Sequence, residues 1–139
     1  MSRNNSNSIV IDGCTIHETP SFGRQIFRWR TGGQDNVLNG ITIRNTIWGH
    51  GWDEDASGNV AIDGFDGLGD TNWLITNTYA TSEFSYGDGK DEIPGFPSVT
   101  YPGLVTDLWT DPYNSIFEFK DAGFPGKGDS GDPRWRVGL

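Results

Sequence analysis

Three segments of the chain repeat one pattern at an interval of 32 residues, beginning at Ser8, Gly40 and Asn72. In this register the apolar residues fall into two columns, Ile9 with Ile41 and Trp73, and Ile11 with Ile43 and Ile75. A fixed period combined with the two-residue alternation of a strand is typical of a solenoid, in which each unit buries its apolar face against the next. The repeat therefore predicts a stack of parallel strands.

The residues after the apolar columns predict a recurring turn. Gly13, Asn45 and Asn77 share one column, and both residue types tolerate the positive φ that a tight turn requires. Because neighbouring strands lie about 4.8 Å apart, Asn45 and Asn77 would stack as a ladder of side-chain amides. In the same register Asp12 and Arg44 would form a surface ion pair.

The rest of the chain is less regular. Further short strands are expected at residues 25–30, 59–63 and 114–120. Four prolines predict a long irregular loop over residues 82–113, and the turn-rich residues 121–139 are expected to form a cap across the C-terminal end. Residues 1–139 are treated as a single domain. Because no capping segment precedes the first repeat, we expect this domain to be excised from a larger multidomain protein.

Composition narrows the possible partners. The formal net charge of −9 disfavours nucleic acid and acidic polymers and favours a neutral ligand. Cys14 is the sole cysteine, which excludes an internal disulfide. No apolar run is long enough for a transmembrane helix, so membrane insertion is not expected, and any secretion signal would lie outside this sequence.

Two sequence features resemble a known family. The pattern Ile-x-Ile-x-Asn-Thr at residues 41–46 resembles the right-handed parallel β-helix of the pectate-lyase-like superfamily. The whole chain, and especially its ending Gly131-Asp-Pro-Arg-Trp135, resembles C-terminal β-helix domains of secreted polysaccharide-utilisation proteins of gut Bacteroidota. Such domains occur attached to xylanases, and some bind xylan. The resemblance implies an all-β fold, a short right-handed parallel β-helix (solenoid) with long irregular loops and a C-terminal cap. It also implies a secreted or cell-surface location and a covalently linked catalytic domain.

Catalysis by this chain is not expected. A lyase on this fold needs carboxylates that hold calcium and an arginine or lysine that removes a proton, and the resemblance assigns neither role here. A glycoside hydrolase needs two carboxylates at a defined separation, and 19 acidic residues single out no pair. A truncated pectate-lyase-like polysaccharide lyase and a structural end-piece of a larger β-helix remain as alternatives.

Carbohydrate binding asks less of the sequence, because sugar rings stack on exposed aromatic side chains while polar groups contact their hydroxyls. Six tryptophans in a small domain exceed what a core needs. The densest candidate site follows the second repeat and contains Trp48, His50, Trp52 and Asp53. The alternative is that Trp48 packs beneath this loop and the acidic residues are simply solvated.

Further ligand-binding candidates lie outside that loop. Strand alternation places Arg28 and Arg30 on one face, where they could contact a glycan near Asp63. Tyr86 and Trp109, with Tyr101, could form a second wall, or the proline-rich region could pack on itself.

No cofactor is expected, although a structural calcium ion remains open. Asp63, Asp66 and Asp70 form a glycine-spaced acidic segment, but their spacing does not match an EF-hand. The two histidines, His17 and His50, would need a further ligand to hold zinc. The sequence thus predicts a non-catalytic carbohydrate-binding module whose expected ligand is xylan or another neutral hemicellulose.

Overall fold

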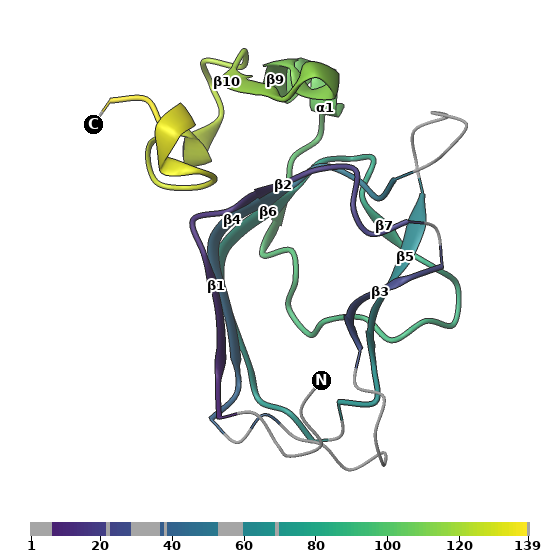
Figure 1. Cartoon of the computed structure of the whole chain (residues 1–139). Coiled ribbons are helices and arrows are strands. Elements are labelled where there is room, and N and C mark those ends of the chain that lie inside the picture. Colours follow the sequence, from purple (N-terminus) through teal and green to yellow (C-terminus); the bar gives the residue numbers. More distant parts are fainter. Residues whose placement is uncertain are drawn as a thin grey trace.

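The computed structural model describes residues 7–21, 23–28, 37, 39–52, 60–68 and 70–138. Two sheets of parallel strands face each other across an apolar core, and an antiparallel pair with short helical segments lies beyond one end of them (Figure 1). The structured helical segments are three or four residues long, and none in the described ranges is long and apolar enough to cross a membrane.

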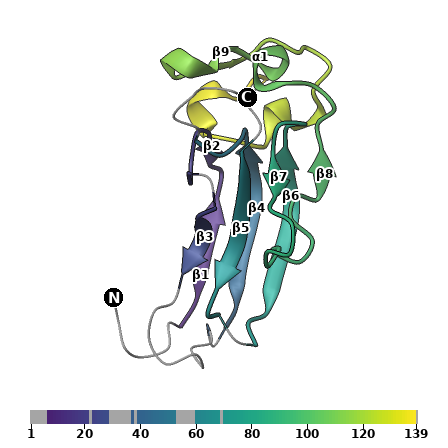
Figure 2. The ribbon, with the colours of Figure 1, turned by 90° about the vertical axis from the view of Figure 1, so that its right-hand side faces the viewer.

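The first sheet is built from the three repeats. Its strands are ordered β1-β4-β6-β8, with β2 also paired to β4. Their bounds are β1 Ile9–Asp12, β2 Thr15–Ile16, β4 Ile41–Trp48, β6 Trp73–Ala80 and β8 Val99–Thr100. Ile9 pairs with Ile41, which pairs in turn with Trp73, so the 32-residue register predicted from the sequence is confirmed. Figure 2 shows β1, β4 and β6 side by side.

The predicted turn and its amide ladder are also confirmed. Asn45 and Asn77 each have a φ of 49°, in the left-handed region that asparagine tolerates. Asn77 Nδ2 donates to Asn45 Oδ1 at 2.9 Å, and Asn45 Nδ2 donates to Asp12 Oδ1 at 2.9 Å. Asp12 also accepts a 2.8 Å hydrogen bond from Arg44 Nε. Adjacent strands are therefore linked at the turn by side chains as well as by the backbone.

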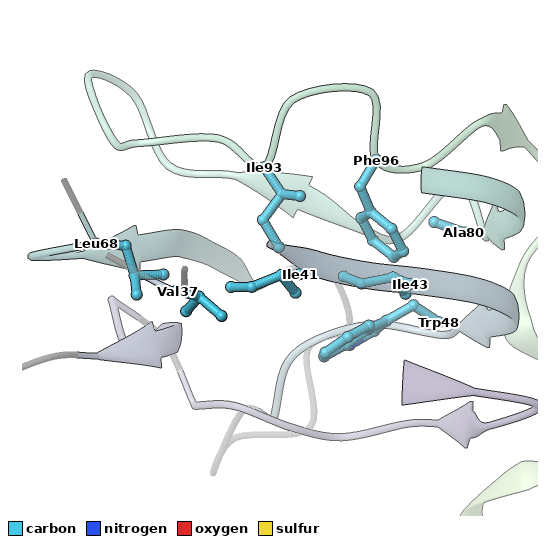
Figure 3. Packing of buried hydrophobic residues seen from close by; sticks show 8 residues of the cluster. All are labelled: Val37, Ile41, Ile43, Trp48, Leu68, Ala80, Ile93 and Phe96. Carbon is cyan, nitrogen blue, oxygen red and sulfur yellow. The ribbon is translucent and has the colours of Figure 1, made fainter. Parts of the chain in front are cut away.

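The second sheet faces the first across the main core. It consists of β3 Gln25–Arg28, β5 Ala61–Asp66 and β7 Ser85–Tyr86, again parallel. The apolar cluster between the two sheets contains the residues drawn in Figure 3, namely Val37, Ile41, Ile43, Trp48, Leu68, Ala80, Ile93 and Phe96. We call this cluster the main core.

The C-terminal third has a different architecture. Its elements are α1 Val105–Leu108, β9 Trp109–Asp111, η1 Pro112–Asn114, β10 Ile116–Phe119, η2 Pro125–Gly128 and η3 Pro133–Trp135. Strand β10 confirms the strand predicted at residues 114–120, but it pairs antiparallel with β9. The region predicted as an irregular loop, residues 82–113, contains β7, β8, α1 and β9.

A second apolar cluster joins this third to the repeats. Its members are Ile47, Tyr79, Tyr101, Val105, Leu108, Trp109 and Phe124. We call it the outer core, because Ile47 and Tyr79 belong to β4 and β6 and face away from the main core. The ends of these two strands are therefore buried on both faces, Trp48 and Ala80 in the main core and Ile47 and Tyr79 in the outer core.

The predicted solenoid is wrong. The fold is mostly β, but the described residues form three short sheets that mix parallel and antiparallel pairs, accompanied by one α-helical turn and 3₁₀ segments. The repeat extends the first sheet only as far as β6. Beyond it, β8 pairs with β6 over just two residues, and the chain then turns to an antiparallel pair. The sequence after residue 82 lacks the apolar period that would continue a stack, and its prolines cannot donate the backbone hydrogen bonds of a sheet ladder.

The predicted cap across the C-terminal end is wrong as well. Gly131 N–H donates to Asn45 O at 2.8 Å, and Asp132 N–H donates to Thr15 Oγ1 at 2.9 Å. The end of the tail is therefore anchored to the turns of the first and second repeats, while Phe124 packs against Tyr79 of β6.

Candidate functional site

Two of the tryptophans predicted to contact a ligand are buried, namely Trp48 of the loop site and Trp109 of the second wall. Trp48 is 3 % exposed, packs against Phe84 and Phe96, and donates its Nε1–H to Thr19 O at 2.9 Å. Trp109 is fully buried in the outer core. A sugar ring cannot reach either indole, so both assignments are corrected and these side chains are core residues. For Trp48, this is the alternative given above, in which it packs beneath the loop.

Trp52, by contrast, presents its side chain to solvent. It is 44 % exposed, while its backbone N–H is fixed by a 2.9 Å hydrogen bond to Pro20 O. The backbone is thus anchored and the indole remains available to a ligand. Asp53 and Arg30, which were predicted to act beside it, lie outside the described residues.

His50 is only 2 % exposed and is held by two hydrogen bonds. Its Nδ1 lies against Gly51 O, and a carbonyl oxygen can only accept, so Nδ1 carries the proton. Nε2 is then the acceptor for the hydroxyl of Tyr113, at 3.2 Å. Burial prevents His50 from contacting a glycan hydroxyl directly, which corrects its predicted role. Instead it orients Tyr113.

Tyr113 is a candidate that the sequence analysis missed. Its ring is 47 % exposed although its hydroxyl is bound to His50. Burial, followed by the charges of Glu83 and Glu18, raises the pKa of Tyr113, so the phenol stays neutral and its surroundings carry negative charge. The available signal was the segment Asp-Pro-Tyr-Asn at residues 111–114, a turn that exposes its aromatic residue.

His17 completes the cluster around His50. Its ring lies 4.6 Å from that of His50 between centroids and 5.3 Å from that of Tyr113, in edge-to-face contact with both. Trp109 and Phe117 approach it at 5.9 and 6.1 Å. Both ring nitrogens of His17 are buried and have no hydrogen-bond partner among the described residues. Burial, with a smaller contribution from the charge of His50, lowers the pKa of His17 to about 4.

Arg28 and Tyr86 lie apart from this cluster in the second sheet. Arg28 is exposed and pairs with Asp66, its register partner, with Nε and Oδ2 3.5 Å apart. The sequence analysis had placed it near Asp63, which pairs with Gln25 instead. Tyr86 packs against the main core and donates its hydroxyl proton to Phe96 O at 3.1 Å, and burial raises its pKa. Its phenol therefore stays neutral and turned inward, so the predicted aromatic wall does not form.

The acidic candidates for calcium are not brought together. Asp63 is 7 % exposed, whereas Asp66 and Asp70 are exposed. Asp63 and Asp66 lie three residues apart on β5, and successive side chains of a strand alternate between faces, so their carboxylates point in opposite directions. Within the described ranges no group of three or more His, Cys, Asp or Glu side chains could hold a metal ion.

The structure brings His17, His50 and Tyr113 into contact, and Trp52 follows His50 by two residues in the chain. The rings of Trp52 and Tyr113 are exposed, His50 is buried, and His17 is half-buried with both ring nitrogens covered. Among the described residues, neither imidazole is hydrogen-bonded to a charged side chain. This arrangement is suited to contacting a ligand through ring faces.

Comparison with known proteins places the chain in a family. The family described as Domain of unknown function (DUF5123) matches residues 9–135. This match covers nearly the whole chain, so the chain belongs to that family. No curated protein and no solved structure gives a significant match.

Proposed function

We propose that this member of the family is a non-catalytic carbohydrate-binding domain whose ligand is a plant cell-wall polysaccharide, xylan or another neutral hemicellulose. The observation that carries the proposal is the exposure of Trp52, at 44 %, on a backbone that is hydrogen-bonded in place. An exposed indole on an anchored backbone offers a flat apolar face, and the C–H faces of sugar rings are suited to stacking on it.

Tyr113 supplies a second exposed ring. Trp52 follows His50 by two residues, and Tyr113 is hydrogen-bonded to His50 at 3.2 Å, so His50 links the two rings. In the proposed mode of binding, sugar rings stack on Trp52 and Tyr113. The hydrogen bond from the Tyr113 hydroxyl to His50 holds the Tyr113 ring in one orientation. The conformational entropy that this side chain loses on ligand binding is therefore smaller.

The charge around the rings supports a neutral polymer. Glu18 and Glu83 act electrostatically on Tyr113, and the whole chain carries a net charge of −9. A polyuronate such as pectate would be repelled by this field, whereas the hydroxyls of a neutral xylan or glucomannan are indifferent to it. The domain would act as an accessory module, linked to a glycoside hydrolase and working outside the cell.

Affinity electrophoresis in gels containing xylan, glucomannan or pectate tests the proposal. We expect retardation by a neutral hemicellulose and none by pectate. Trp52→Ala should weaken binding about tenfold, which corresponds to about 1.4 kcal/mol. Leu74→Ala is the matched control, because Leu74 is also an exposed apolar side chain, 59 % exposed on the outer face of β6. Absence of retardation in every gel, or equal retardation of the Trp52→Ala variant, would overturn the proposal.

A further inference from the structure

The pair formed by His17 and His50 lies where three parts of the chain meet. His17 follows β2, His50 follows β4, and the rings that enclose them, Trp109, Tyr113 and Phe117, come from β9, η1 and β10. The imidazoles therefore join the repeat-built sheet to residues 105–119, which we call the C-terminal clamp.

The two sides of this joint are held very differently. On the sheet side, Gly49 N–H donates to Ile16 O at 2.7 Å, and Thr81 N–H donates to Trp48 O at 3.0 Å. Gly49 also lies so close to His17 that a β-carbon there would collide with Nδ1. On the clamp side, the contacts to His17 are aromatic edges, and among the described residues the hydrogen bond from the clamp to the pair is that from Tyr113 to His50. Val105, Leu108 and Trp109 of the clamp also belong to the outer core, so opening of the clamp has to uncover that cluster as well.

No described side chain is positioned to neutralise a proton on this pair. Glu18 is next to His17 in the chain, and Glu83 accepts the Val105 N–H at 2.6 Å; the charges of both act on Tyr113. On the clamp itself, Tyr113 is neutral, Asp111 Oδ2 accepts from Asn114, and Glu118 alternates with Phe117 on β10 and is exposed. None of these carboxylates accepts a hydrogen bond from His17, whose two nitrogens are unpartnered.

We propose that His17 is an acid-sensitive joint, which holds the C-terminal clamp on the sheet while its imidazole is neutral and releases the clamp when it takes up a proton. An imidazolium needs hydrogen-bond acceptors, and among the described residues none accepts from either ring nitrogen of His17. Water can reach the pair if Trp109, Tyr113 and Phe117 move away, so protonation favours the open clamp.

Hydrogen exchange measured by mass spectrometry on the whole chain at pH 7.5 and pH 5.0 tests this joint. After correction for the intrinsic pH dependence of exchange, amides of residues 105–119 should lose protection at least about tenfold at pH 5.0. Amides of β4 should keep theirs. Unchanged protection of the clamp, or an equal loss in β4, would overturn the proposal.

A pair of variants separates His17 from the carboxylates that also titrate in acid. His17→Phe keeps an aromatic ring in the box and cannot take up a proton, so its clamp should stay protected at pH 5.0. Glu83→Gln is the control, and it should open at pH 5.0 as the wild type does. If His17→Phe fails to fold, His17→Gln serves the same purpose, since it is neutral at both pH values. Opening of the folded His17 variant to the wild-type extent would overturn the proposal. No glycan is involved, so this outcome is independent of carbohydrate binding.

Discussion

The repeat-built sheet and the C-terminal third are held together by different kinds of contact. In the sheet, each repeat meets the next through equivalent residues, Ile43 on Ile75 and Asn45 beside Asn77, so one pattern specifies every contact. In the C-terminal third, the contacts are individual: Tyr101 donates to Asp121 at 2.8 Å, and Phe124 meets Tyr79 edge to face. The comparison teaches that periodic sequence specifies register, whereas aperiodic sequence depends on single anchoring side chains.

Among the anchoring side chains of the C-terminal third, Phe124 is the one whose removal should destabilise the protein most. This residue is fully buried, with its ring 4.8 Å from Tyr79, 5.6 Å from Tyr101 and 5.3 Å from Phe119. Phe124→Ala should lower the free energy of unfolding by about 4 kcal/mol, since no neighbouring element repeats its contact. Urea denaturation followed by circular dichroism measures the loss. Ile116→Ala, an exposed change in the same third, should cost about 0.5 kcal/mol or less.

The equivalent test in the sheet is Ile43→Ala. Ile43 is fully buried between Ile11 and Ile75 in its column. We expect a loss of about 3 kcal/mol, somewhat less than for Phe124, because a smaller side chain is removed. Urea denaturation again gives the value, and Leu74→Ala, on the solvent face of β6, should change it little. If Ile43→Ala lowered the free energy of unfolding much more than Phe124→Ala does, the comparison between the two regions would be reversed.

The joint between the two regions should make stability depend on pH. The pKa of His17 falls from its ordinary 6.5 to about 4 on folding. Between these values the unfolded chain binds more protons than the folded one, so the free energy of unfolding decreases as the pH falls from about 7 towards 4, and levels off below. Because His17 is half-buried rather than fully enclosed, we expect the melting temperature to drop by roughly 5 °C.

Calorimetry of the wild type and His17→Phe across this pH range isolates the contribution of His17. The pKa of Asp121 is lowered by its hydrogen bonds from Tyr101 and Gly123, so its stabilising contribution is lost only as the pH falls below its ordinary 3.8. The histidine and aspartate effects therefore occupy separate pH windows. An unchanged slope between pH 7 and 4.5 in His17→Phe would contradict this assignment.

The smallest expected effect concerns the amide ladder. Asn77→Gly keeps the positive φ of 49° and removes the hydrogen bond to Asn45, at an expected cost of about 1 kcal/mol. Asn77→Ala removes the same bond and adds the strain of a left-handed alanine, about 1 kcal/mol more. Thermal unfolding of both variants separates the two contributions. Equal stability of the two variants would show that the turn does not impose its φ on this residue.

The sequence predicted correctly which residues of neighbouring strands pair, but not how many strands the stack contains. The alignment of Ile9 with Ile41 and Trp73 was readable because strand alternation and a constant period leave only one in-register pairing. The predicted solenoid is wrong because the pairing of neighbouring strands does not determine how many further strands join the stack. Antiparallel pairing of β9 with β10 is a contact between neighbours in the chain, and no repeat indicates it.

The candidate site was predicted least well. The segment after the second repeat does contain an exposed aromatic residue, but it is Trp52 and not Trp48. His17 and Tyr113 are far apart in the sequence and meet at His50 only because the C-terminal third folds back over the end of β4. No local pattern records such a contact.

The sequence by itself determined which residues of the three repeats lie side by side, because period and alternation are local properties of the chain. Only the tertiary structure decided which faces of those strands are covered. Ile47 and Trp48 point to opposite sides of β4, and both are buried because the main core covers one side and the outer core the other. Burial is a property of what packs against a residue, and here the packing segment lies dozens of residues away.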